Sequence, residues 1–335
     1  MAGRRRYLLH RSGWAVATIL VVVTFNFLLF RVLPGDPAKS GLRDPRLSPA
    51  AVAALQERFG LDKPVLIATD GGDPFDSQYF AYLGALARAD LGVSYAFRDR
   101  PVTDLLGQAL VNTLWLIMPA QLLAIVLGTV LGLLAAWRRR TRIDTGALTF
   151  SLVMWSLPTF FLGIVLLYFG SAWFGLPTAG RGTIGVEFGS LWEQLVDIGR
   201  HMFLPTLTLA LVLLGEYMLI MRSSVVEVFS EDYILTAKAK GLSTFRIIRD
   251  HALRNAMLPL VTLIALTLGF TVAGAIQVEA VFSWPGLGEL TVRAVGQRDY
   301  PVLQGAFLLL AVSVVLANLA ADVVYGWLDP RVAQA

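Results

Sequence analysis

Residue types that usually perform acid–base or metal chemistry are scarce in this sequence. The sequence has three histidines, His10, His201 and His251. We find no partner for any of them at metal-ligand or triad spacing. The sequence has no cysteine, which excludes a thiol nucleophile, a disulfide scaffold and a cysteine-ligated metal. The metalloprotease, nucleophile-elbow and phosphate-loop motifs are also absent. We therefore expect no catalytic residue and no metal site, and any ATP that powers this protein must be held by another subunit.

Polar residues inside apolar runs are costly in a membrane and are functional candidates. Glu216 could be a polar residue that lines the substrate path. Alternatively, its carboxylate could extend to the membrane–water interface or pair with Arg222. Asp322 is expected to be a structural partner of a neighbouring helix. Four neutral residues could line a cavity or join helices by hydrogen bonds: Asn112, Gln121, Gln277 and Asn318. Of all these, we take as possible pathway residues Asn112, Gln121, Glu216 and Gln277.

The strongest local pattern is a basic segment between two apolar runs. Ser230 supplies a helix cap, and two acidic residues follow it, as the helix dipole favours. Residues 233–240 then predict a short helix that stops at Gly241. A second helix, capped by Ser243, is predicted to run toward Pro259. The basic residues around this helix–glycine–helix elbow are Lys238, Lys240, Arg246, Arg249 and Arg254. Such an elbow could lie on anionic lipid headgroups or dock into another protein.

The composition indicates the environment in which these residues are positioned. Of 335 residues, 56% are hydrophobic and 16% are charged, and the mean hydropathy is +0.64. Soluble proteins carry about 25% charged residues, so this chain is too apolar for a water-soluble globule. The net charge of +4 is too small to indicate nucleic-acid binding by itself. We therefore expect an all-α integral membrane protein.

Six apolar stretches define the expected transmembrane helices. A helix that crosses the hydrocarbon core needs about 20 apolar residues. The stretches that meet this need are 12–30, 105–137, 145–180, 201–221, 255–278 and 300–321. The first is too long for a signal h-region and has no small-x-small cleavage site, so we expect an uncleaved span. In the second, Gly128 and Gly132 form a small-xxx-small pattern that predicts close helix packing.

Basic residues predict the orientation of these spans. Fifteen of the 28 lie before the first span, between the second and third, between the fourth and fifth, and after the sixth. Because Lys and Arg collect in cytoplasmic loops, both termini are expected in the cytoplasm. Residues 34–104 then fall outside, where helix-like spacing of aromatic and apolar residues predicts a small folded extracytoplasmic segment.

At the elbow the sequence resembles the permease subunits of bacterial ATP-binding cassette importers, in the form used by oligopeptide- and dipeptide-type importers. The resemblance rests on Thr236-Ala237-Lys238-Ala239-Lys240-Gly241-Leu242 and on His251-Ala252-Leu253-Arg254-Asn255. Further motifs in the same order are Leu33-Pro34-Gly35-Asp36-Pro37, Asp90-Leu91-Gly92-Val93-Ser94, Phe282-Ser283-Trp284-Pro285-Gly286-Leu287-Gly288 and Arg298-Asp299-Tyr300-Pro301. Two departures are extra sequence at 66–77 and Leu219, where such permeases often carry arginine.

The resemblance implies a function and a set of partners. Similar permeases insert the helix around 237–242 into a cleft on an ATPase subunit, whose closing moves the helix as a lever. By this resemblance the coupling residues are Thr236, Ala237, Lys238, Ala239, Lys240, Gly241, Leu242, Arg246 and His251. The chain would form half of a translocation path in the bacterial inner membrane, together with a second permease, one or two ATPase subunits and an extracytoplasmic binding protein. ATP and magnesium would be bound by the ATPases, so this chain would be no enzyme, carry no cofactor and bind no nucleic acid.

The same resemblance divides the chain and suggests its cargo. Residues 1–33 would be the cytoplasmic N-terminus and first span, 34–104 the extracytoplasmic segment, and 105–335 a five-helix permease core with a coupling loop at 222–258. Peptides are the default cargo, and oligosaccharides or nickel chelates are the alternatives within the family. A secondary transporter driven by an ion gradient through Glu216 or Asp322, and a membrane scaffold, are the competing functions from other classes.

Overall fold

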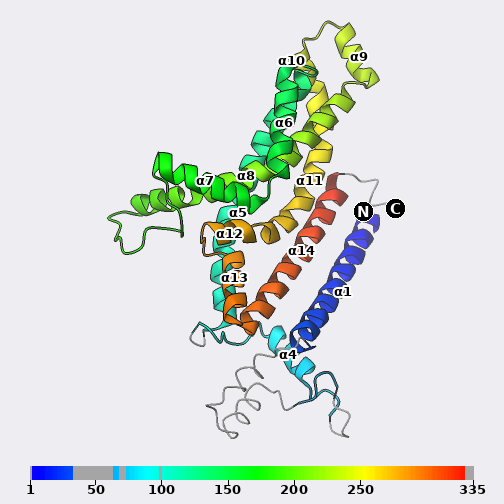
Figure 1. The fold of residues 1–335 in the computed structure, drawn as a ribbon. Coiled ribbons are helices and arrows are strands. Elements are labelled where there is room, and N and C mark those ends of the chain that lie inside the picture. The colour runs from blue at the N-terminus through cyan, green and yellow to red at the C-terminus, as the bar shows by residue number, and fades with distance from the viewer. Residues whose placement is uncertain (1, 33–62, 68–72, 98–99, 329–335) are drawn as a thin grey trace. The chain divides into compact units, whose positions relative to one another are not determined.

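The computed structural model describes residues 2–32, 63–67, 73–97 and 100–328, and within these ranges the protein is almost entirely helical (Figure 1). The helices are α1 (Ala2–Val32), α4 (Gln78–Ala87), α5 (Val102–Trp137), α6 (Arg142–Ser156), α7 (Thr159–Phe174), α8 (Leu191–Val228), α9 (Asp232–Ala239), α10 (Thr244–Ile247), α11 (Leu253–Gly274), α12 (Ile276–Val281), α13 (Leu287–Gln297) and α14 (Tyr300–Leu328). A π-helical turn, Ile248–Ala252, joins α10 to α11. The expectation of an all-α membrane protein is confirmed.

Four helices are long and apolar enough to cross a membrane, and a bent pair adds a fifth candidate. The four are Leu9–Arg31 within α1, α5, α8, and Tyr300–Ala320 within α14. The pair α6 and α7 passes the same test together but is bent by 104°. The described residues thus hold four or five candidate spans where the sequence predicted six. The expected fifth span, 255–278, corresponds to α11 and the start of α12.

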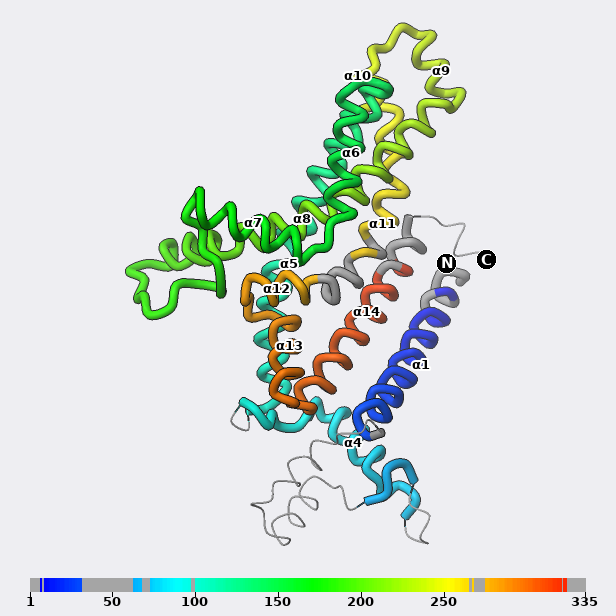
Figure 2. Tube along the Cα trace, in the orientation of Figure 1, coloured from blue at the N-terminus to red at the C-terminus, as the bar shows by residue number. Residues whose placement is uncertain are grey.

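The bend between α6 and α7 is the main departure from the expected helices. The predicted third span, 145–180, is not one continuous helix, because the chain turns at Leu157 and Pro158 (Figure 2). Leu157 has extended backbone angles, φ −73° and ψ 133°. Proline has no N–H to donate, and its ring disfavours helical angles in the residue before it. Pro158 therefore ends α6 and begins α7.

One compact unit, comprising the described residues 2–8, 111–289 and 316–328, is built around α8. Helices α6, α7 and α11 pack along α8. A Cβ at Gly132 of α5 would lie 2.7 Å from the Met218 carbonyl oxygen of α8, and one at Gly128 would lie 2.7 Å from the Tyr217 Cβ. The small-xxx-small pattern therefore brings the α5 and α8 backbones close together, which confirms its predicted role in packing.

The other unit, made of the described residues within 9–110 and 290–315, contains most of α1 together with α4 and the start of α5. Phe27 of α1 contacts the rings of Tyr79 and Tyr82 on α4, with centroids 5.2 and 5.4 Å apart. The Thr24 hydroxyl also hydrogen-bonds the Tyr79 hydroxyl at 2.7 Å. The helix-like aromatic spacing is thus confirmed over α4. Part of the extra sequence at 66–77, namely residues 68–72, lies outside the described ranges.

Candidate coupling site

The elbow begins as the sequence predicted, with a short helix stopped by a glycine. Helix α9 ends in a Schellman motif, because the Leu242 amide donates to the Ala237 carbonyl (3.3 Å) and the Gly241 amide to the Lys238 carbonyl (2.9 Å). Gly241 has φ +75°, in the left-handed region, and a Cβ there would meet nothing within 4 Å. Glycine is thus favoured at 241 by backbone conformation, and the space around it is open.

The predicted cap at Ser230 is wrong, since this residue belongs to the turn before the helix. Its hydroxyl donates to the Glu227 carbonyl (2.5 Å), and Glu231 occupies the N-cap of α9 without a side-chain capping bond. Ser243 does occupy the N-cap position of α10, but its side chain caps nothing there. The negative charge expected in the first turn of α9 is supplied by Asp232.

A small apolar core holds the elbow in shape. Ile234 and Ala237 on α9 are buried against Ile247 and Ala252, and Leu242 packs at the edge of this cluster. Two residues from the end of α8, Val228 and Phe229, pack on the same core. The Asn255 amide nitrogen of α11 also donates to the Tyr233 hydroxyl (2.8 Å). The elbow is therefore a folded unit attached to the ends of α8 and α11 (Figure 1).

Most of the proposed coupling residues form its outer surface. The exposed members of the set are Thr236, Lys238, Ala239, Lys240, Gly241, Arg246 and His251. Leu235 and Phe245 add apolar area to this surface, each 55% exposed. Two members of the set are not exposed: Ala237 is buried in the elbow core, and Leu242 is half-buried at its edge. The surface is thus basic with apolar side chains among the charges.

An ion pair lies on the surface of the elbow. Arg249 and Asp250 are neighbours in the π-helical turn, and their side chains form two bonds, of 2.6 and 3.0 Å. The hydrogen bond from Arg249 holds the pKa of the Asp250 carboxyl below its usual range. Asp250 is therefore ionised at neutral pH and offsets one positive charge of the elbow.

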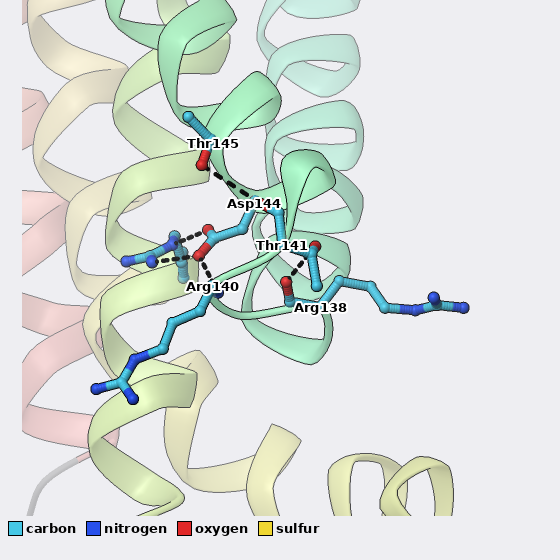
Figure 3. Close-up of polar contacts among 6 residues, drawn as sticks. Arg138, Arg140, Thr141, Asp144 and Thr145 are labelled. Atoms are coloured by element: carbon cyan, nitrogen blue, oxygen red, sulfur yellow. Dashed lines mark hydrogen bonds and ion pairs between the residues drawn. The ribbon is translucent and has the colours of Figure 1, made fainter.

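A second ion pair joins the start of α6 to the end of α8. Arg222 donates to both carboxylate oxygens of Asp144, at 2.6 and 2.8 Å, and the Arg140 amide donates to the same carboxylate at 2.9 Å. Figure 3 shows these three bonds meeting at Asp144. The suggested pairing of Arg222 with Glu216 is wrong. Residues six apart lie about 120° apart around a helix, so their side chains point in different directions.

Two pathway candidates, Asn112 and Gln121, connect helices through hydrogen bonds, and the other two lie in more open positions. The Asn112 side-chain amide donates to the Pro285 carbonyl (2.8 Å), and its side-chain oxygen accepts from Arg181 (2.9 Å). Gln121 is buried and donates to the Tyr217 hydroxyl, which is 2.7 Å from the Thr267 hydroxyl. These contacts hold helices together.

Glu216 and Gln277 lie in more open positions. Glu216 is half-buried on α8, and Gln277 is exposed on α12. Among the described residues, no ion pair of Glu216 is present. Asn318 is likewise exposed, on α14.

Sequence reasoning missed a fully buried carboxylate, Glu279. It accepts bonds from the Thr113 hydroxyl (2.7 Å) and the Gly288 amide (2.6 Å), at the start of α13. A Cβ on Gly286 would lie 2.3 Å from a Glu279 carboxylate oxygen, so glycine is required for the close approach. The cluster explains the glycines of the motif that begins at Phe282. The available signal in the sequence was that Glu279 follows directly after the apolar run 255–278.

The histidine assignments need one correction. His201 lies one helical turn after Asp197, with its Nδ1 3.6 Å from a carboxylate oxygen, so a partner at helical spacing does exist. Within the described ranges, no cluster of three or more His, Cys, Asp or Glu residues could hold a metal ion.

The fold and the elbow define a class of helical membrane protein with a folded basic surface on a loop between spans. Two family models match this chain: "Binding-protein-dependent transport system inner membrane component" over residues 128–334, and the N-terminal component of the same systems over residues 4–116. The chain belongs to this family. It is accordingly a multi-pass permease of the bacterial inner membrane, a transport component of ATP-binding cassette importers and not itself an enzyme.

Curated relatives match along nearly the whole chain. The di/tripeptide transport system permease protein DppB of Pseudomonas aeruginosa is 35% identical over 97% of this chain and 98% of its own. The dipeptide permease DppB of Escherichia coli is 36% identical over 98% of both chains. The glutathione transport system permease GsiC of Salmonella choleraesuis is 36% identical over 97% of this chain and 98% of its own.

Solved structures support the fold alone. Chains of the MetNI methionine ABC transporter in inward-facing conformations superpose with TM-scores of 0.51 and 0.54 at 18% identity. Each match covers 69% of this chain and 95% of the other.

Proposed function

We propose that this permease carries peptides and couples to its ATPase through the exposed surface of the elbow. The observation that carries the proposal is the elbow itself, a self-packed helix pair whose buried face is apolar and whose outer face holds most of the coupling residues. A rigid element of this kind can transmit a displacement to α8, which leads into the elbow, and to α11, which follows it. Peptide cargo is supported by the names of relatives that match over nearly the full chain.

The proposed topology has six spans and both termini in the cytoplasm. Helix α11 supplies the sixth crossing beyond the five candidates, since its 22 residues extend about 33 Å. Residues 1–33 form the N-terminus and first span, 34–104 the extracytoplasmic segment, and 105–335 the permease core. The coupling loop, 222–258, then faces the cytoplasm.

The proposed assembly contains a second permease, one or two ATPase subunits and an extracytoplasmic binding protein. ATP and magnesium are bound by the ATPases, because this sequence has no phosphate-loop motif. We propose Glu216 and Gln277 as pathway residues, since their more open positions leave them available to a solute. Asn112 and Gln121 position helices around the path through the bonds described above.

A substitution at Gly241 tests the coupling surface. Gly241→Asp adds a side chain and a negative charge where a Cβ meets nothing, and Asp tolerates left-handed backbone better than most residues. The elbow should therefore still fold, while the basic docking surface is disrupted. We expect normal membrane insertion and loss of both ATPase co-purification and peptide uptake.

The matched control for this variant is Gly185→Asp. Gly185 has φ +79° and equally open surroundings, but it lies in the α7–α8 connection. The control should co-purify with the ATPase and transport as the unmodified protein does. Uptake by Gly241→Asp at the unmodified rate would show that the elbow is not the coupling surface.

A further inference from the structure

The ion pair between Asp144 and Arg222 combines features that a surface salt bridge lacks. The two side chains come from helices α6 and α8, and their exposed fractions are 5% and 22%. Arg222 uses two nitrogens to contact both carboxylate oxygens, a geometry that fixes orientation as well as distance. We call Asp144, Arg222 and the Arg140 amide the α6–α8 clamp.

Stability alone does not account for the α6–α8 clamp. Removing two charges from water costs free energy, and their mutual attraction often does no more than offset this cost. Proteins in which apolar residues replace such a pair can be equally stable. Arg140 also adopts φ +64° at the turn where its amide donates to Asp144. Such conformations are uncommon for residues other than glycine. A partly buried pair of fixed geometry is suited to holding two elements in one register.

The position of the clamp connects it to the elbow. Arg222 lies in the last two turns of α8, and α8 ends at Val228, which packs on the elbow core. A displacement of the elbow is therefore delivered to the segment of α8 that carries Arg222. Helix α6 packs along α8, and Asp144 lies in its first turn. The clamp thus joins the cytoplasmic end of α6 to the moving end of α8 in the proposed topology.

We propose that the α6–α8 clamp makes the elbow, the end of α8 and the start of α6 move as one body, and that it stays closed throughout the transport cycle. Asp144 and Arg222 are positioning residues, which act through the elbow and touch no solute. The proposal rests on the proposed coupling function of the elbow. A broken clamp would let α8 follow the ATPase while α6 stays behind, so ATP hydrolysis would continue with little transport.

The test is the number of peptides imported per ATP hydrolysed by the complete importer in proteoliposomes. Asp144→Asn removes the charge, and Arg222→Lys keeps a charge but cannot form the two-nitrogen contact. For both variants we expect assembly and peptide-stimulated ATPase activity to persist, with the ratio of peptide to ATP reduced about tenfold. Asp76→Asn is the matched control, since it breaks the exposed Lys63–Asp76 pair of the extracytoplasmic segment and should leave the ratio unchanged.

A covalent replacement tests whether the clamp stays closed. The natural sequence has no cysteine, so the double variant Asp144→Cys and Arg222→Cys can be linked selectively with a flexible bis-maleimide. We expect linking to restore the peptide-to-ATP ratio of this variant toward the unmodified value. If linking abolishes transport while hydrolysis continues, the clamp must open during the cycle and the proposal is wrong.

The remaining outcomes separate the clamp from the coupling function. An unchanged ratio in both single variants, or a proportional loss of uptake and hydrolysis, would assign the pair a structural role and overturn the proposal. Uptake by the unmodified importer without any ATPase would instead overturn the proposed coupling function. Arg222→Lys is the variant least disturbing to folding, so it decides the matter if Asp144→Asn fails to assemble.

Discussion

At the scale of single residues, the glycines show how the absence of a side chain sets helix separation. Gly132→Ala would place a Cβ 2.7 Å from the Met218 carbonyl oxygen and 2.8 Å from the Met221 Cβ. Helices α5 and α8 must then separate, at a cost of about 1–3 kcal/mol. We expect a lower thermal unfolding temperature for the purified protein in detergent. Gly107→Ala in the same helix meets nothing within 4 Å, so a similar loss there would refute the close-packing explanation.

At the scale of elements, Asp299 ties residues 94–96, which precede α5, to the start of α14. Its carboxylate accepts bonds from the Ser94 hydroxyl and from the amides of Tyr95 (3.3 Å) and Ala96 (3.1 Å). Ser94 and Asp299 are fully buried, so Asp299→Ala leaves the buried Ser94 hydroxyl without its acceptor. We expect a loss of about 2–4 kcal/mol, measured by thermal unfolding and by faster proteolysis near residue 95. Asp104→Ala, at an exposed position in α5, is the control and should change neither.

The elements also show which features sequence patterns can predict. Apolar runs located α1, α5, α8 and α14 because burial in lipid demands long apolar helices. Gly241 was predicted as a helix stop because a positive φ is a local requirement of the chain. The Asp144–Arg222 pair was not predicted, because its partners are 78 residues apart and no local spacing relates them. The bend at Pro158 had a local signal in the proline, but apolar composition outweighed it in the prediction.

At the scale of the whole molecule, the α6–α8 clamp bears on how often the chain crosses the membrane. The bent pair α6–α7 could be a broken span or a re-entrant loop. The clamp holds the first turn of α6 against the last turns of α8, so these two ends lie on the same side of the membrane. Because α8 itself crosses, its start near Ser190 lies on the opposite side. The chain must therefore cross once between Asp144 and Ser190, which supports a broken span.

Labelling of introduced cysteines in intact cells tests this topology. Ile184, in the connection between α7 and α8, is 97% exposed, and Ala239 of the elbow is also exposed. A membrane-impermeant maleimide should label Ile184→Cys in intact cells, but label Ala239→Cys and Arg139→Cys only after permeabilisation. In a re-entrant arrangement Arg139→Cys and Ile184→Cys would instead be labelled alike, with Ala239→Cys on the other side. That result would place the basic α5–α6 turn and the elbow on opposite sides of the membrane, which the direct contact of Asp144 with Arg222 does not allow.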